Sequence, residues 1–210
     1  KQWIIDELGG VMWPNLEADD VISILATDKE MDEETIIVSI DKDFKGVPGI
    51  YYDYNRGEYH QPTEQEADNF HLIQTITGDV TDGFKGVPKM GPVTAKKVLD
   101  KDGYTWETVV KCYEKAGLTE QDALMNAWMA RLLRIDNYCF RTNTIKRLWT
   151  PKNYQTKDIL KISQQGLSVT GTLDGDDPAL FLQSPFAVSP NDLKMAESFT
   201  ETTTGSKASH

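Results

Sequence analysis

The sequence predicts an α/β protein in which a parallel sheet is followed by a helical region. Residues 35–40 form a continuous run of β-branched residues, which is typical of a strand buried on both faces in a parallel sheet. Residues 50–54, which are rich in tyrosine, are expected to form a second strand. Helix signals surround both runs, and the pattern beyond Leu99 is helical. Strands mixed with helices in this order favour an α/β core.

Charge divides the chain of 210 residues, net −11, into three predicted regions. Residues 1–83 hold 19 acids and 5 bases, residues 84–157 hold 7 acids and 14 bases, and residues 158–210 hold 7 acids and 3 bases. We expect an acidic α/β core, a basic helical region and a mostly disordered tail rich in Ser, Thr, Gly and Asp. The acidic region could hold metal ions and the basic one phosphates, although charge blocks are also common on plain solvated surface.

Composition argues against several classes of protein. No apolar run approaches the roughly 20 residues of a membrane span, so no membrane association is expected. Cys112 and Cys139 are a weak basis for a disulfide, which favours a reduced, cytoplasmic setting. Two cysteines and three scattered histidines argue against a zinc site. The sequence also lacks a P-loop ending and any Ser/His/Asp or Cys/His arrangement.

The first acidic group lies at a helix start. Residues 1–8 read as the end of an amphipathic helix that stops at Gly9 and Gly10. A second helix is expected to begin with an acidic run, whose members are Glu17, Asp19 and Asp20. Acids favour a helix N-terminus, but three in four positions exceed what a cap needs, so metal binding is the preferred interpretation.

The second acidic group, Asp41 and Asp43, follows the first predicted strand directly. Open α/β sheets place their active sites beyond the carboxyl ends of their strands, although an acidic turn at this point is also common. Farther on, Thr63 and Glu66 form a capping-box pattern that predicts a helix over residues 64–77. His71 within it is expected to serve packing or hydrogen bonding rather than metal binding.

The stretch Gly78–Leu99 combines two kinds of chemistry. Asp79 and Asp82 are carboxylates three residues apart beside glycines, and such a pair is costly unless a cation neutralises it. Mg²⁺ prefers oxygen ligands of this kind. A glycine turn at Gly91, followed by Pro92 at a helix start, would offer backbone N–H groups to a phosphate. The stretch therefore predicts part of a metal site joined to a phosphate-binding hairpin, a pairing that suggests a metal-dependent nuclease.

Two more helices are expected after this stretch. One spans residues 104–116, and another is capped by Thr119 and Asp122 and is expected to reach Ile135. Arg131 and Arg134 would share one face of that helix, where they either line a phosphate path or are simply solvated.

Together the acidic groups predict a site for two divalent ions. Carboxylates that converge on one sheet edge would repel one another without metal, and two ions can support in-line phosphodiester cleavage. The predicted metal-binding acids are Glu17, Asp19, Asp20, Asp41, Asp43, Asp79 and Asp82.

Four motifs in order resemble the flap endonuclease and 5′→3′ exonuclease family, most of all the exonucleases of short-tailed phages. They are Glu-Ala-Asp-Asp at 17–20, Asp-Lys-Asp-Phe at 41–44, Gly-Asp-x-x-Asp-Gly at 78–83 and Gly-Val-Pro-x-x-Gly-Pro-x-Thr-Ala at 86–95. The resemblance, over about residues 10–150, implies a PIN-like α/β core and a helix-hairpin-helix variant. It also implies Mg²⁺ or Mn²⁺ as the cofactor. The implied substrates are DNA or RNA–DNA hybrids, which are cut from a 5′ end or at a branch.

Residue by residue, the resemblance implies that the seven acids hold the metals and that Asp41 and Asp79 carry catalysis. It further implies that the hairpin binds duplex DNA and holds K⁺ through backbone carbonyls. The expected DNA-binding residues are Lys85, Gly86, Val87, Lys89, Gly91, Thr94, Lys96 and Lys97. For a phage protein, the expected location is the cytoplasm of the host cell.

In one respect the sequence departs from the family. The family pattern opens with a strand that ends in a metal-binding aspartate, a second aspartate and a basic arch, and none of these precedes Glu17 here. We therefore expect a fragment, or a product that needs a separate N-terminal chain to supply the missing acids. Two alternatives to a 5′ nuclease stay open, which are a non-catalytic DNA-binding fragment and a PIN-type ribonuclease.

Overall fold

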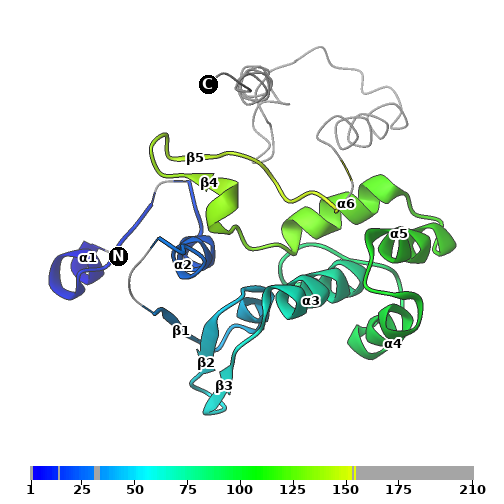
Figure 1. Ribbon diagram of the computed structural model, residues 1–210, viewed down its shortest axis with the longest axis horizontal. Helices are drawn as coiled ribbons and strands as arrows, with labels where there is room; N and C mark the ends of the chain where they lie inside the picture. The colour runs from blue at the N-terminus through cyan, green and yellow to red at the C-terminus, as the bar shows by residue number, and fades with distance from the viewer. Residues whose placement is uncertain (1, 14, 31–33, 153, 155–210) are drawn as a thin grey trace, which may run out of the picture. The chain divides into compact units, whose positions relative to one another are not determined.

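The computed structural model (Figure 1) describes residues 2–13, 15–30, 34–152 and 154, which all belong to the first of two units, Lys1–Val169. The described part is mixed α/β, with a small sheet and six α-helices, as predicted. The tail expected to be disordered, residues 158–210, lies outside the described residues.

Two helices begin the chain, and both confirm the sequence expectation. α1 (Gln2–Leu8) is followed by Gly9, which has a φ of 64° and so stops the helix. α2 (Ala18–Ala26) begins after Glu17, whose side chain makes no capping hydrogen bond. The side chain of Glu17 is therefore not used as a helix cap.

Three strands form the sheet, in the order β1 (Ile36–Ser39), β2 (Ile50–Asp53) and β3 (Glu58–His60). β1 and β2 are parallel, as predicted, and the short 3₁₀ helix η1 (Lys42–Gly46) lies between them in sequence. β3, which was not predicted, pairs antiparallel with β2. Among the described residues β1 pairs with β2 alone, which makes it an edge strand of this sheet.

Only one face of β1 is buried. Ile37 is 6% exposed and packs with Phe44, Val47 and Tyr51, whereas Val38 is 61% exposed. The expectation that this strand is buried on both faces is therefore wrong for the described part of the chain. Side chains alternate between the faces of a strand, so Ile36 and Val38 point away from this core cluster.

α3 (Glu64–Thr77) has the predicted bounds and the predicted capping box. The Thr63 N–H donates to Glu66 Oε2 at 2.9 Å, and the Glu66 N–H donates to Thr63 Oγ1 at 3.2 Å. α3 contacts η1 as well as α4 (Pro92–Asp102), α5 (Trp106–Lys115) and α6 (Glu120–Met129). It thus connects the strand side of the fold to the helices, as Figure 1 shows.

The core formed with these helices contains His71, which is 1% exposed. Its Nε2 lies 2.8 Å from the Ala127 carbonyl oxygen, and its ring meets Trp149 edge to face. Its predicted role in packing and hydrogen bonding is confirmed.

α6 ends at Met129, so the expectation that it reaches Ile135 is wrong. The chain turns back because Leu133 packs beside Ile24 of α2, and its N–H donates to Asp20 Oδ1 at 2.8 Å. The 3₁₀ helix η2 (Ile135–Asn137) and the hairpin of β4 (Tyr138–Cys139) and β5 (Thr144–Ile145) follow.

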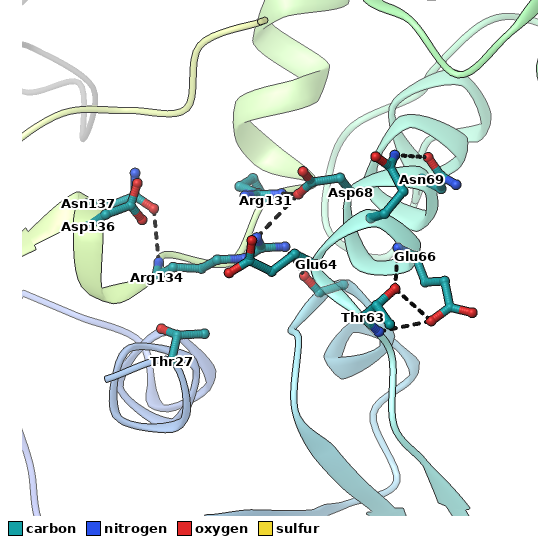
Figure 2. Close-up of polar contacts among 12 residues, drawn as sticks. Thr27, Thr63, Glu64, Glu66, Asp68, Asn69, Arg131, Arg134, Asp136 and Asn137 are labelled. Carbon is teal, nitrogen blue, oxygen red and sulfur yellow. Dashed lines mark hydrogen bonds and ion pairs between the residues drawn. The ribbon is translucent and has the colours of Figure 1, made fainter. Parts of the chain in front are cut away.

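Arg131 and Arg134 consequently lie beyond the helix, in a largely buried ion cluster (Figure 2). Their Nη1 atoms lie 2.9 Å and 3.2 Å from Asp68 Oδ1, and both side chains are 10% exposed. Arg134 also donates from Nη2 to the Gly46 carbonyl at 2.9 Å. Both expectations for these arginines, a solvated helix face and a path for phosphates, are therefore wrong. The two arginines instead connect α3 to the end of η1.

Candidate carboxylate site and glycine hairpin

Asp41 and Asp43 are held at the end of β1. Asp41 Oδ1 accepts the Asp43 N–H at 2.9 Å, which caps η1, and the Asp41 N–H donates to Ser39 Oγ at 3.1 Å. Asp43 Oδ1 accepts a 2.6 Å hydrogen bond from Gln74 Nε2. The strand end therefore positions both carboxylates, and α3 fixes the second.

Asp79 and Asp82 lie on the loop that follows α3. Asp79 Oδ1 accepts the Thr81 N–H at 2.9 Å. The Asp79 carbonyl accepts the Phe84 N–H at 3.0 Å, and this bridge closes the loop. Asp82 is exposed within it.

Lys42 joins the two loops. Its Nζ lies 2.5 Å from Asp79 Oδ2 and 3.7 Å from Asp43 Oδ1. The hydrogen bond from Lys42 lowers the pKa of Asp79 below its ordinary value, and the same bond raises the pKa of Lys42. Sequence reasoning recorded Lys42 only as part of a motif and missed Gln74, for which the sequence offers no signal.

The electrostatics link four carboxylates into one group, Asp41, Asp43, Asp79 and Asp82, which we call the carboxylate cluster. Burial raises the pKa of Asp43, and the negative charges of Asp41 and Asp82 add to that rise, although Lys42 opposes it. Desolvation raises the pKa of Asp82, with further contributions from Asp79, Asp41 and Asp19. The cluster holds more negative charge than Lys42 neutralises.

The three acids of the α2 start behave differently from one another. Asp19 contributes its negative charge to Asp82, so it lies within electrostatic reach of the cluster. Asp20 instead accepts the Leu133 N–H, and burial raises its pKa to about 6. Glu17 is exposed and makes no cap. The structure therefore connects Asp19 to the cluster and gives Asp20 a bond that anchors the segment after α6.

The cluster has the chemistry of a divalent-metal site but not a complete cage. Its donors are carboxylate oxygens, the ligands that Mg²⁺ and Mn²⁺ prefer, and an ammonium ion already bridges two of them. Within residues 2–13, 15–30, 34–152 and 154, no three carboxylates, imidazoles or thiolates are close enough to hold a common ion.

The glycine hairpin, residues 85–91, directly follows the loop that carries Asp79 and Asp82. The Val87 N–H donates to the Ile76 carbonyl at 2.7 Å, and the Gly86 N–H donates to Asn126 Oδ1 at 2.9 Å. The hairpin is therefore tied to both α3 and α6. Val87 is 4% exposed, so its side chain serves the core and leaves only its backbone to contact a ligand.

The helix α4 begins at the end of this hairpin. Gly91 is its N-cap and makes no side-chain capping bond, and Pro92 is its first residue. Thr94, Lys85, Lys89 and Lys97 are exposed, and among the ion pairs of the described residues these three lysines take no part. Lys96 differs, because it pairs with Asp100 at 2.8 Å. The hairpin thus presents cationic side chains beside a helix N-terminus.

Comparison with known proteins gives a consistent answer. The chain is 31% identical over 173 residues to the exodeoxyribonuclease of Enterobacteria phage T3, an alignment that covers 67% of this chain and 57% of the relative. It is 32% identical over 171 residues to the exonuclease of Escherichia phage T7, covering 66% and 57%. A flap endonuclease Xni of Colwellia psychrerythraea is 36% identical over 97 residues, covering 41% and 33%.

The chain, whose described part is mixed α/β, is thus related by sequence to a class of nucleases. These matches confirm the resemblance predicted from the motifs, because the chain is homologous to two phage exonucleases and to a flap endonuclease. The chain spans 57% of the length of the two phage relatives. No family model matches it. None of the helices in the described part has the length and apolar character needed to cross a membrane.

Proposed function

We propose that this chain forms part of a metal-dependent 5′→3′ exonuclease or structure-specific 5′ nuclease that hydrolyses phosphodiester bonds in duplex or flap DNA. RNA–DNA hybrids fall within the proposed substrate class, and the host cytoplasm is the proposed location for a phage protein of this kind. One observation carries the proposal. Carboxylates from two separate loops meet at a single ammonium ion, directly before a hairpin with exposed lysines.

In this proposal the carboxylate cluster, with Asp19 in support, would hold Mg²⁺ or Mn²⁺, and Asp41 and Asp79 carry catalysis. Two such ions, when bound, activate water and stabilise the leaving oxygen of an in-line displacement. The protein's own part is orientation, because Gln74 holds Asp43 and the Thr81 N–H holds Asp79. We also propose that the α/β core is PIN-like.

Duplex phosphates would contact the glycine hairpin. The N-terminus of α4 offers the positive end of a helix dipole, and Lys85, Lys89 and Lys97 add exposed charge. The proposal also includes a K⁺ ion bound by backbone carbonyls of the hairpin, because the resemblance to the family implies one. Binding of this kind weakens steeply as salt rises.

A second candidate is a DNA-binding fragment that needs a separate N-terminal chain for catalysis. Two observations favour keeping it. No three acids of the described residues converge on one point, and the chain spans 57% of its two phage relatives. In this case the second chain would supply the remaining acids.

The test is cleavage of a 5′-labelled flap duplex by this chain, with Mg²⁺ and with EDTA. Release of short products only with Mg²⁺, and its loss in Asp79→Asn, would support the nuclease. Salt-sensitive binding without cleavage would support the DNA-binding fragment. Faster cleavage of single-stranded RNA than of the flap duplex would contradict both and favour a PIN-type ribonuclease.

A further inference from the structure

The backbone on both sides of Lys85 is held by hydrogen bonds, while Lys85 itself is exposed. The Phe84 N–H donates to the Asp79 carbonyl at 3.0 Å, and the Phe84 side chain is buried. The Gly86 N–H belongs to the peptide unit that follows Lys85, and it donates to Asn126 Oδ1 at 2.9 Å. In the part of the chain that the structure describes, Lys85 takes part in no ion pair. A fixed backbone therefore presents an unpaired cationic side chain.

Asn126 is oriented for this contact by the helix that carries it. Its Nδ2 donates at 2.7 Å to the carbonyl of Asp122, four residues earlier in α6. Because the amide nitrogen is used in this way, the amide oxygen faces the hairpin and accepts the Gly86 N–H, 40 residues away in the sequence. Both ends of the Asn126 amide are thus occupied, and the amide links α6 to the hairpin.

The Gly86 N–H depends on this side chain. Gly86 is buried, so water does not readily replace Asn126 as the acceptor. Since this N–H is already engaged, the group beside it that can reach a phosphate is the ammonium of Lys85.

We propose that Asn126 is a positioning residue for duplex binding, which fixes the peptide unit after Lys85 and so directs the Lys85 ammonium at a DNA phosphate. This inference rests on the proposed function, because it needs the hairpin to contact duplex DNA. Asn126 is uncharged and touches no phosphate itself. It acts on the duplex through Lys85 alone.

The expected effect follows from freeing the backbone beside Lys85. The loss of one neutral hydrogen bond changes an equilibrium constant by about two- to tenfold, so Asn126→Ala should weaken duplex binding within this range. Because Lys85 would then lose its phosphate contact, the dependence of log K on log salt should fall by up to about 0.9, although Asn126 carries no charge. A purely structural loss lowers the fraction of folded chain and leaves this salt dependence unchanged.

The experiment measures binding of the full chain to the flap duplex by fluorescence anisotropy, in EDTA and over a range of salt concentrations. One double-mutant cycle combines Asn126→Ala with Lys85→Ala, and a second combines Asn126→Ala with Lys97→Ala, whose charge lies on α4. The matched control is Asn69→Ala, which removes the same amide from α3, where its contact is Gln65 of the same helix. Chemical denaturation checks the folding of each variant. If Asn126→Ala does not fold, both cycles are run with Asn126→Ser, which keeps a side-chain oxygen.

The first cycle should be non-additive, with Asn126→Ala adding little to the loss caused by Lys85→Ala, and the second should be additive. Asn69→Ala should bind as the wild type does. Additive losses in the first cycle, unchanged binding in Lys85→Ala, or a wild-type salt dependence in Asn126→Ala would each overturn the inference and leave the proposed function standing. If the wild type itself did not bind the flap duplex, the proposed function would be overturned together with the inference.

Discussion

The backbones of Gly78 and Gly86 pass so close together that neither position has room for a side chain. A Cβ on Gly86 would lie 2.3 Å from the Gly78 nitrogen, and a Cβ on Gly78 would lie 2.3 Å from the Lys85 carbonyl carbon. Both glycines also have positive φ angles, of 70° and 60°. This close approach holds the carboxylate loop against the start of the hairpin, so the metal-binding and DNA-binding parts of the proposed site share one contact.

Gly86→Ala is therefore expected to destabilise the fold by about 3 kcal/mol or more, because backbone atoms cannot move aside as a flexible side chain can. Chemical denaturation measures the change. Gly91→Ala is the matched control, since its φ is −77° and a Cβ there would meet nothing within 4 Å. Similar losses in the two variants would show that the close contact is not the cause.

Asp79→Asn should abolish metal-dependent cleavage while leaving duplex binding nearly unchanged. The amide keeps the size of the side chain but removes the charge that pairs with Lys42 and would hold a metal ion. Cleavage and binding assays on the same flap duplex separate the two effects. Asp136→Asn changes an acid outside the cluster and should retain both. Equal cleavage by Asp79→Asn and the wild type would contradict the site assignment.

Lys97→Ala should weaken duplex binding several-fold and reduce the dependence of log K on log salt by about 0.9, the value for one lost phosphate contact. Lys96→Ala should have a smaller effect, because Lys96 is already paired with Asp100. Fluorescence anisotropy over a range of salt concentrations measures both. Lys111→Ala, on the exposed side of α5, serves as the control. An unchanged salt slope in Lys97→Ala would remove this lysine from the interface.

Asp68→Ala is expected to destabilise the fold by about 3 kcal/mol, because it leaves two largely buried arginines without their shared counter-ion. Burial acts to raise the pKa of Asp68, yet the hydrogen bond from Arg131 and the charges of Arg134 and Lys152 hold that pKa below its ordinary value. Asp136→Ala breaks the exposed pair with Arg147 and should cost less than about 1 kcal/mol. Thermal and chemical unfolding should rank the variants in this order.

Stability should also fall as the solution is made acidic. Burial, helped by the charge of Arg131, lowers the pKa of His71 from 6.5 to about 3. Between these two pKa values the unfolded chain binds a proton at His71 that the folded chain does not. The contribution of His71 to the free energy of unfolding is therefore complete above pH 6.5. It is lost as the pH falls, at up to about 1.4 kcal/mol per pH unit. Nuclear magnetic resonance should show the His71 ring still neutral at pH 5.

Asp20 works in the opposite direction and provides the control. Its pKa is raised to about 6, so its contribution to stability is complete below the unfolded value of 3.8 and is lost as pH rises through 6. Asp20→Asn keeps an oxygen for the Leu133 N–H and removes this titration. The variant should therefore lose stability more steeply than the wild type between pH 6 and pH 4.5. Parallel curves would contradict the assignment to Asp20.

Local signals in the sequence predicted much of this fold. Thr63 and Glu66 fixed the start of α3 because a capping box acts within four residues, and Asp41 and Asp43 could be placed because they follow a strand directly. The end of α6 was mispredicted, since a contact between Leu133 and Asp20, more than a hundred residues apart, decides it. The roles of Lys42 and Gln74 at the carboxylate cluster could not be predicted for the same reason, because Asp79 and Asp43, which they contact, lie on other parts of the chain.

The uncovered face of β1 has a practical consequence for handling the protein. Ile36, Val38 and Ile40 are all more than half exposed, and β1 is an edge strand with one side of its backbone unpaired within the described residues. Such an edge is a template on which another extended chain can assemble, and no charged residue interrupts it between 35 and 40. Concentrated solutions are therefore expected to aggregate through this strand, and Val38→Lys should delay the onset of light scattering on warming.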